Sequence, residues 1–161
     1  MRLNLIVVHL TFLLHLVFCH SLKPFTSGHI KRTMSKLPEK LIVGYANWHQ
    51  CDDTIIRAVE QGVNVVIWFS INLSVDIHGQ PVVTGGPDMD CVAEKIKAIA
   101  EKNLETIHLI SIGGWNSPHP STVNPPEAMY EAWDNWNRNI AARPDKGFFG
   151  FDGFDWDIEG K

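Results

Sequence analysis

The sequence predicts an α/β protein whose strands form a parallel sheet. From residue 41 onward, short apolar runs alternate with amphipathic stretches of helical period, as in chains built from strand–helix units. The run VNVVIWF at residues 63–69 is almost entirely apolar and rich in β-branched residues, which is typical of a strand buried on both faces. With 161 residues, 45% of them hydrophobic and 20% charged, the chain has the composition of a globular domain and not of a disordered protein.

The expected elements alternate along the chain. The apolar runs predict four strands, at residues 41–46, 63–69, 106–112 and 151–159. Apolar residues at helical spacing predict three helices, at residues 52–62, 88–103 and 127–141. Asp52 is the expected N-cap of the first helix, and Ala100 is expected on the apolar stripe of the second. In the third helix we expect Trp133 and Trp136 to pack in the core rather than to form a sugar platform.

Two long connections between the expected strands and helices are expected to be loops. Residues 70–87 contain three glycines and are expected to be a functional loop, because connections of this length are uncommon in compact domains. Residues 115–126 hold four prolines and are also expected to be a loop.

The N-terminal segment predicts a secretory signal. Arg2 precedes an apolar stretch at residues 3–18, and cleavage is expected near Cys19 or His20. The alternative is a membrane anchor, but polar residues interrupt the stretch and it is shorter than the roughly 20 apolar residues of a spanning helix. We therefore expect residues 1–19 to be removed, residues 20–40 to be a flexible leader, and the mature protein to be secreted and not held in a membrane.

Charge and cysteine content restrict the partners and cofactors. The formal net charge of −4 lacks the basic character of nucleic-acid-binding proteins. Cys51 and Cys91 have no zinc-type spacing, so no metal is expected, and a disulfide and two buried free thiols are equally compatible with the sequence. Asn72 begins the sequence Asn-Leu-Ser, an N-glycosylation motif in a secreted chain.

The last expected strand carries the chemistry. Its sequence is DGFDWDIE at residues 152–159. Acidic residues alternate with apolar ones here, so one face of the strand is acidic (Asp155, Asp157 and Glu159) and the other is apolar (Phe154, Trp156 and Ile158). Successive acids on one face lie about 6.6 Å apart along a strand. Asp152 falls outside the acidic alternation, and we expect it at the start of the strand, hydrogen-bonded to backbone, in a structural role.

Three neighbouring acids predict shared protons. Burial and like charge both raise carboxyl pKa values, and no Lys, Arg or His lies within the run. Glu159 is the candidate proton donor, because it lies nearest the C-terminal end of the strand, where barrel active sites open. A solvated strand face and a Mg²⁺ or Ca²⁺ site are the alternatives, and both rank behind acid catalysis.

Two motifs carry a resemblance to a known family. Residues 152–159 resemble the DxxDxDxE signature of glycoside hydrolase family 18, the family of chitinases and endo-β-N-acetylglucosaminidases. Residues 111–114, SIGG, resemble the SxGG motif that this family carries one strand earlier. The resemblance implies that residues 41–161 form the N-terminal half of a TIM (β/α)₈ barrel, with strands 1–4 and three helices, since a whole barrel uses about 250 residues. The ending Asp-Ile-Glu-Gly is more similar to the plant class III and fungal type.

The family resemblance also implies an activity, the hydrolysis of β-1,4-linked N-acetylglucosamine polymers by substrate-assisted retaining catalysis without a cofactor. Glu159 would protonate the glycosidic oxygen and later act as base, while the substrate's own acetamido oxygen attacks the anomeric carbon. Asp157 would hold the acetamido group and Asp155 would share its proton. The implied partner is chitin or another glycan containing N-acetylglucosamine.

Supporting positions follow from the same resemblance. Ser111, Gly113 and Gly114 are expected to be structural. The two glycines would allow backbone or substrate to come close, or they simply end the strand. Aromatic rings at the ends of the first three strands would stack on sugar rings, although core packing is equally compatible with the first two: Tyr45, Phe69 and Trp115. No histidine is given a role.

Two rival interpretations stay open. One is a chitin-binding lectin on the same fold, although lectins of the family usually lack the acid that Glu159 supplies. The other is an inactive fragment, because barrel strands 5–8, with their tyrosine and substrate-stacking tryptophan, are not found in these residues. The outer edges of the first and fourth strands would then be unpaired, which favours association.

Overall fold

The structure is a computed structural model that describes residues 37–46, 51–120 and 122–159. The chain divides into two units, Met1–Thr33 and Met34–Lys161, and all described residues belong to the second. The expected signal at residues 1–19, most of the expected leader and Cys19 therefore lie outside the described residues.

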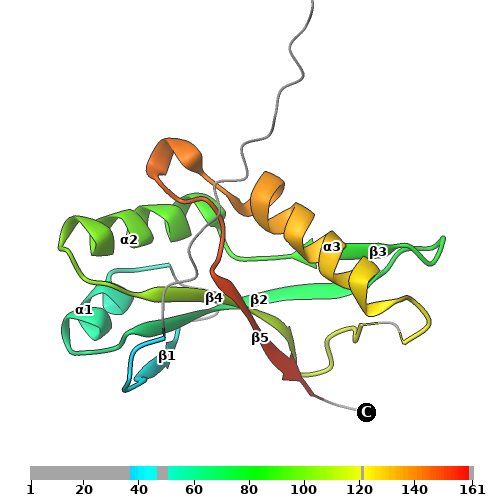
Figure 1. Ribbon diagram of the computed structural model, residues 1–161, viewed down its shortest axis with the longest axis horizontal. Coiled ribbons are helices and arrows are strands. Elements are labelled where there is room, and N and C mark those ends of the chain that lie inside the picture. The colour runs from blue at the N-terminus through cyan, green and yellow to red at the C-terminus, as the bar shows by residue number, and fades with distance from the viewer. Residues whose placement is uncertain (1–36, 47–50, 121, 160–161) are drawn as a thin grey trace, which may run out of the picture. The chain divides into compact units, whose positions relative to one another are not determined.

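The second unit is a mixed α/β structure in which a curled parallel sheet forms a half-barrel with three helices (Figure 1). The parallel strands follow the order β1-β2-β4-β5. Their bounds are β1 Val43–Tyr45, β2 Val65–Val75, β4 Ile107–Gly114 and β5 Gly153–Ile158. All four strands predicted from the apolar runs are thus confirmed, with ends that differ by a few residues.

The prediction of a loop at residues 70–87 is wrong. Strand β2 continues to Val75, and β3 (Pro81–Gly85) returns antiparallel to it. The extension forms because Ile71 and Leu73, 1% and 2% exposed, alternate with polar residues and bury one face of the hairpin. Its turn is stabilised by Asp76, whose carboxylate accepts hydrogen bonds from the backbone of the two residues flanking Gly79.

Asn72, the candidate glycosylation residue, lies within this hairpin and not in a loop. It is half-buried in β2 and pairs with Thr84 of β3. Upstream of it, the peptide bond between Phe69 and Ser70 is cis, at the place where the pairing of β2 with β4 becomes irregular.

The three predicted helices are confirmed, as α1 Thr54–Glu60, α2 Met89–Glu101 and α3 Pro126–Trp136. A short π-helical turn, Asn137–Ala141, follows α3. Asp52 is not the N-cap of α1: Asp53 occupies that position, and Asp52 instead accepts a hydrogen bond from the Thr54 backbone just before the helix. Ala100 is exposed and does not belong to the buried stripe of α2, because it faces away from the sheet near the end of the helix.

The core lies between the helices and the convex face of the sheet. Alternate residues of β2 and β4 point into it, and residues of α2 and α3 meet them, as in the set Val66, Trp68, Ile110, Ile112, Val92, Ile99, Met129, Trp133 and Trp136. Trp133 and Trp136 are each 5% exposed, which confirms the prediction that they are core residues. Trp133 meets Phe154 of β5 edge to face, with ring centroids 4.9 Å apart. One face of β5 therefore packs against the core.

The start of β5 is fixed by the end of the preceding helical segment. Asn137 is buried, and its side-chain amide donates to the carbonyl of Phe151 at 3.0 Å and accepts from the amide of Phe151 at 2.7 Å. The Phe151 ring stacks on Trp136 at a centroid distance of 6.1 Å. A Cβ at Gly150 would lie 2.8 Å from the Asn137 carbonyl oxygen, so a residue without a side chain is needed there.

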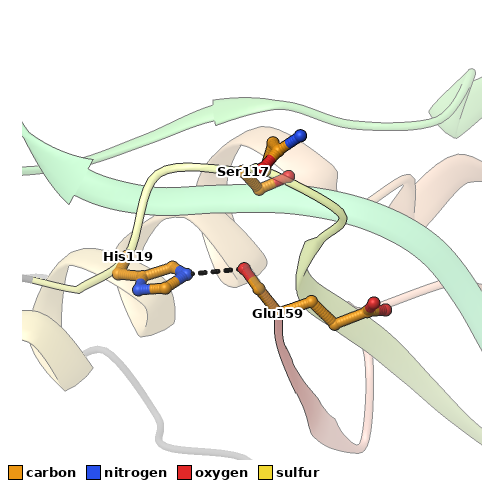
Figure 2. A pocket seen from close by; sticks show the side chains of 4 residues that line it. Ser117, His119 and Glu159 are labelled. Carbon is orange, nitrogen blue, oxygen red and sulfur yellow. Dashed lines mark hydrogen bonds between the residues drawn. The ribbon is translucent and has the colours of Figure 1, made fainter. Parts of the chain in front are cut away.

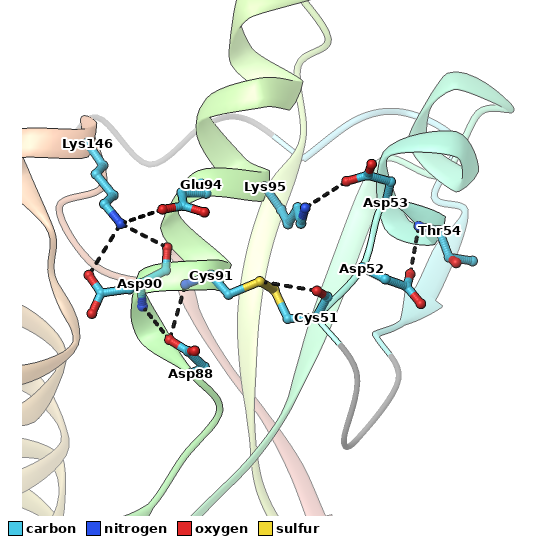
Figure 3. The surroundings of a disulfide bond; sticks show 10 residues. All are labelled: Cys51, Asp52, Asp53, Thr54, Asp88, Asp90, Cys91, Glu94, Lys95 and Lys146. Atoms are coloured by element: carbon cyan, nitrogen blue, oxygen red, sulfur yellow. Dashed lines mark hydrogen bonds and ion pairs between the residues drawn. A yellow bond between two sulfur atoms is a disulfide. The ribbon is translucent and has the colours of Figure 1, made fainter.

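Cys51 and Cys91 form a disulfide, with Cα atoms 6.1 Å apart (Figure 3). Of the two alternatives that the sequence left open, the structure has the bonded pair. The bond joins the segment before α1 to the first turn of α2. Nearby, Lys95 of α2 forms an ion pair with Asp53 at 2.6 Å, which links the same two segments.

Among the described residues, no helix combines the length and the apolar character that crossing a membrane requires.

Candidate active site

The concave face of the half-barrel carries the acids of β5. Residues of β4 and β5 lie side by side in the order Ser111 with Asp155, then Gly113 with Asp157. Asp155 Oδ2 accepts hydrogen bonds from Ser111 Oγ at 3.2 Å and from Tyr45 Oη at 3.1 Å. Tyr45 belongs to β1 and Asp155 to β5, the two outer parallel strands. The curl of the sheet therefore brings its opposite edges within one hydrogen bond of each other.

The surroundings of Tyr45 change the pKa of its phenol group. Burial raises the pKa of Tyr45 above its ordinary value, and the hydrogen bond and negative charge of Asp155 raise it further, with a smaller contribution from Asp157. The ring itself remains 58% exposed. Tyr45 therefore lies outside the core, with its hydroxyl group on Asp155.

Asp157 and Glu159 form a carboxyl pair. The side-chain hydrogen bond with Asp157 raises the pKa of Glu159, and the negative charge of Asp157 and some burial act in the same direction. Two carboxyl groups can share a hydrogen bond only if one of them holds the proton. Glu159 therefore keeps its proton to a higher pH than an ordinary glutamate. Such a pair can donate a proton from one member while the other carries a negative charge.

The glycines after Ser111 allow the strands to pack closely. A Cβ on Gly113 would overlap the carbonyl oxygen of Asp157, and the φ of Gly113 is +112°. A Cβ on Gly114, whose φ is +114°, would lie 3.0 Å from the Phe69 ring. Only glycine fits this geometry without strain, which explains why the Ser-x-Gly-Gly pattern accompanies the acidic strand.

Asp152 lies at the start of β5, as expected. Its carboxylate accepts a hydrogen bond from the His108 amide at 2.8 Å, and its own amide donates to the His108 carbonyl at 2.8 Å. On the convex side, the His108 ring accepts a hydrogen bond from the Trp68 indole at 3.2 Å. Asp152 therefore contacts backbone and is separated from the acidic face.

The remaining aromatic candidates differ in exposure. Phe69 is half-buried against Gly114. Trp115 is 75% exposed directly after β4. The structure thus brings Tyr45, Ser111 and the three acids together, while Trp115 lies at the rim with its ring open to solvent.

A polar pocket at the end of β5 contains a residue to which the sequence gave no role. The pocket has a volume of about 360 Å³ and is lined by Asn116, Ser117, His119 and Glu159 (Figure 2). His119 Nε2 lies 2.9 Å from the carbonyl oxygen of Glu159. The position of His119 in the sequence has neither the metal-ligand spacing nor the catalytic-triad spacing that would single out a functional histidine. The flanking prolines of His119 were a signal that this residue is held in place.

Within residues 37–46, 51–120 and 122–159, no cluster of three or more His, Cys, Asp or Glu side chains is arranged to hold a metal ion. The chain matches no protein-family model, and comparisons with curated proteins and with solved structures give no match either. The site has to be interpreted from its own residues.

Proposed function

We propose that this protein is a secreted glycoside hydrolase of the family 18 type, which cleaves β-1,4-linked N-acetylglucosamine polymers such as chitin. The observation that carries the proposal is the Asp157–Glu159 pair, in which contact with Asp157 raises the pKa of Glu159 at the C-terminal end of a parallel strand. A general acid for glycoside cleavage has to hold its proton near neutral pH, and the contact with Asp157 shifts the pKa of Glu159 in that direction.

The half-barrel corresponds, in this proposal, to strands 1–4 of a TIM (β/α)₈ barrel. Parallel strands in sequential order, helices on the convex face and acids at the carboxyl end of a strand support the assignment. The hydrogen bond from Tyr45 to Asp155 across the concave face supports it further, because a flat sheet would keep β1 and β5 apart.

Each acid has its own part in the proposed reaction. Glu159 donates its proton to the glycosidic oxygen as that bond breaks, and the acetamido oxygen of the substrate forms a bond to the anomeric carbon. Asp157 holds the acetamido group and stabilises the positive charge of the oxazolinium ion. Glu159, now ionised, removes a proton from water as the water oxygen attacks the same carbon. The bond from that carbon to the acetamido oxygen breaks, which restores the acetamido group and gives the product with retained configuration.

Tyr45 and Ser111 act on Asp155 in this scheme. Both donate to the same oxygen, Oδ2, and so hold the carboxylate in one orientation beside Asp157. Asp155 is then placed to share a proton with Asp157 when the latter turns toward the substrate. No metal or cofactor is required by any step.

A second candidate is a glycan-binding protein without turnover. The observation that favours it is Trp115, whose ring is 75% exposed at the rim of the concave face and is available to stack on a sugar.

Hydrolysis of a chromogenic chitobioside, together with binding of N-acetylchitotetraose, separates these candidates. For the wild type we expect both activities, and for Glu159→Gln we expect turnover to fall by about 10²–10⁴-fold with binding retained, because only the proton donor is lost. Glu131→Gln, at an exposed position of α3, is the matched control and should behave as the wild type.

Wild-type turnover in Glu159→Gln would overturn the assignment of the acid. Binding without turnover in the wild type would favour the glycan-binding protein. Absence of both from a folded chain would contradict the hydrolase and the binding protein alike.

A further inference from the structure

The proposed acid lies one residue beyond the paired part of its strand. The last pair in the β4–β5 ladder is Gly114 with Ile158, and Glu159 follows it. The ladder that aligns Asp155 and Asp157 therefore ends before it can fix the backbone of Glu159. Something else has to hold this residue if its carboxyl group is to stay beside Asp157.

His119 provides that contact. Its Nε2 atom lies 2.9 Å from the Glu159 carbonyl oxygen, which can only accept, so Nε2 carries the hydrogen. Both the neutral form protonated at Nε2 and the doubly protonated imidazolium supply this donor. The hydrogen bond is thus compatible with either charge state of the ring.

The segment that presents His119 is constrained on both sides. Ser117 donates its amide to the Gly114 carbonyl at 3.0 Å, which closes a turn directly after β4, and Asn116 within that turn has a φ of +57°. Pro118 and Pro120 flank His119 and restrict the backbone on each side of it. A constrained donor loses little conformational entropy when it binds its acceptor.

We propose that His119 is a positioning residue for the general acid: it holds the peptide group of Glu159 and thereby keeps the Glu159 carboxyl group against Asp157. The inference rests on the proposed function for its catalytic meaning. Figure 2 shows the ring of His119 facing the carbonyl of Glu159 while the carboxyl group points away from the ring. His119 therefore acts through the backbone of Glu159.

In this proposal the rate of catalysis depends on the position of the Glu159 carboxyl group. A displacement of about 1 Å at a reacting group can cost about 10²-fold in rate, and Glu159 lies where the strand no longer restrains it. The described titratable groups that face Glu159 are Asp157, through its side chain, and His119, through the backbone contact.

The test compares three variants by two readouts. His119→Ala removes the donor, His119→Gln keeps an N–H at a similar reach, and His78→Ala changes an exposed histidine in the β2–β3 turn as a control. The first readout is the pKa of the Glu159 carboxyl group, followed by ¹³C NMR titration. The second is the kcat and KM of chitobioside hydrolysis.

We expect His119→Ala to lower the pKa of Glu159 toward its ordinary value, because the carboxyl group no longer stays in contact with Asp157. The kcat should fall by about 10–100-fold with KM little changed, since only the chemical step depends on the position of the acid. His119→Gln should restore most of both properties, and His78→Ala should leave both unchanged.

The pKa readout does not depend on turnover, so the two proposals can fail separately. A lowered pKa in His119→Ala with no hydrolysis by the wild type would support the positioning role and contradict the proposed function. An unchanged pKa in a folded His119→Ala would overturn the positioning role. If the Ala variant fails to fold, a folded His119→Gln that loses the raised pKa would overturn it equally.

Discussion

Asp155 and Asp157 of β5 and Glu159 directly after it differ in the residues that contact them. Asp155 is held by two hydroxyl donors, from Tyr45 and Ser111. Asp157 raises the pKa of Glu159 through a side-chain hydrogen bond and its negative charge, and His119 contacts the carbonyl of Glu159. At the scale of single residues, the site is therefore a chain of contacts that runs from β1 to the end of β5, and each contact can be broken by one substitution.

The contact between Tyr45 and Asp155 should be visible in a tyrosine titration. The chain has two tyrosines, so Tyr130→Phe leaves Tyr45 as the reporter. In that background Asp155→Asn should lower the pKa of Tyr45, because a negative charge that stabilises the protonated phenol is removed, while burial remains. Ultraviolet absorbance of tyrosinate against pH measures the change, with Asp145→Asn at an exposed position as control.

The sign of the linked stability follows from the raised pKa. The contribution of Tyr45 is complete below the ordinary pKa of 10.0 and is lost as the pH rises through the higher value of the folded state. An unchanged tyrosinate titration in Asp155→Asn would mean that the two groups are not in contact in solution.

Gly113 should tolerate no side chain. Gly113→Ala combines overlap with the Asp157 carbonyl and an unfavourable φ, and we expect it to lower the free energy of unfolding by roughly 2–6 kcal/mol. Gly147, with a φ of +75° and nothing within 4 Å of its Cβ position, is the matched control, and Gly147→Ala should cost only about 1–2 kcal/mol. Urea unfolding measures both, and equal losses would contradict the close approach of β5 to β4.

At the scale of elements, periodicity predicted the parallel strands and the helices because each buries one face or both. It missed the β2–β3 hairpin, because three glycines in a long connection are typical of a loop and the alternation of Ile71 and Leu73 with polar neighbours is short. Alternation within β5 also predicted which acids share a face, and the pairing of Ser111 with Asp155 agrees with it. The contact of His119 could not be predicted, because it joins a loop to a backbone carbonyl 40 residues away.

The disulfide should stabilise the packing of α1 and α2. Its cysteines are 40 residues apart, and the chain-entropy relation gives about 4 kcal/mol for a loop of this size. The double variant Cys51→Ser, Cys91→Ser should lose about that much in urea unfolding. Reductant should lower the stability of the wild type to the level of the double variant and leave the variant itself unchanged. Equal stability of the double variant and the wild type without reductant would contradict the presence of the disulfide.

At the scale of the described unit, the half-barrel has two open sides. Strands β1 and β5 each have one neighbouring strand in the part of the chain that the structure describes. Apolar side chains are exposed along both: Leu41 and Val43 near β1 are 47% and 49% exposed, and Trp156 and Ile158 of β5 are 52% and 45% exposed. Unpaired strand edges with apolar neighbours promote association.

Sedimentation velocity should therefore detect association at micromolar concentrations of the isolated chain. Ile158→Lys should weaken it, because a charge on an edge strand opposes pairing with another strand. Ile77→Lys, at a position 95% exposed in the β2–β3 turn, is the matched control and should associate as the wild type does. A wild type that stays monomeric would mean that these edges are covered in solution.

Asp152 affects how β5 aligns with β4 when the sheet forms. Its carboxylate accepts from the amide of His108 and its own amide donates to the carbonyl of His108, and both bonds stabilise the observed alignment of β5 with β4. A slip of one residue would turn Asp155, Asp157 and Glu159 toward the helices and expose the aromatic residues on the concave face. The two hydrogen bonds between Asp152 and His108 thus favour the alignment that keeps the three acids on the concave face.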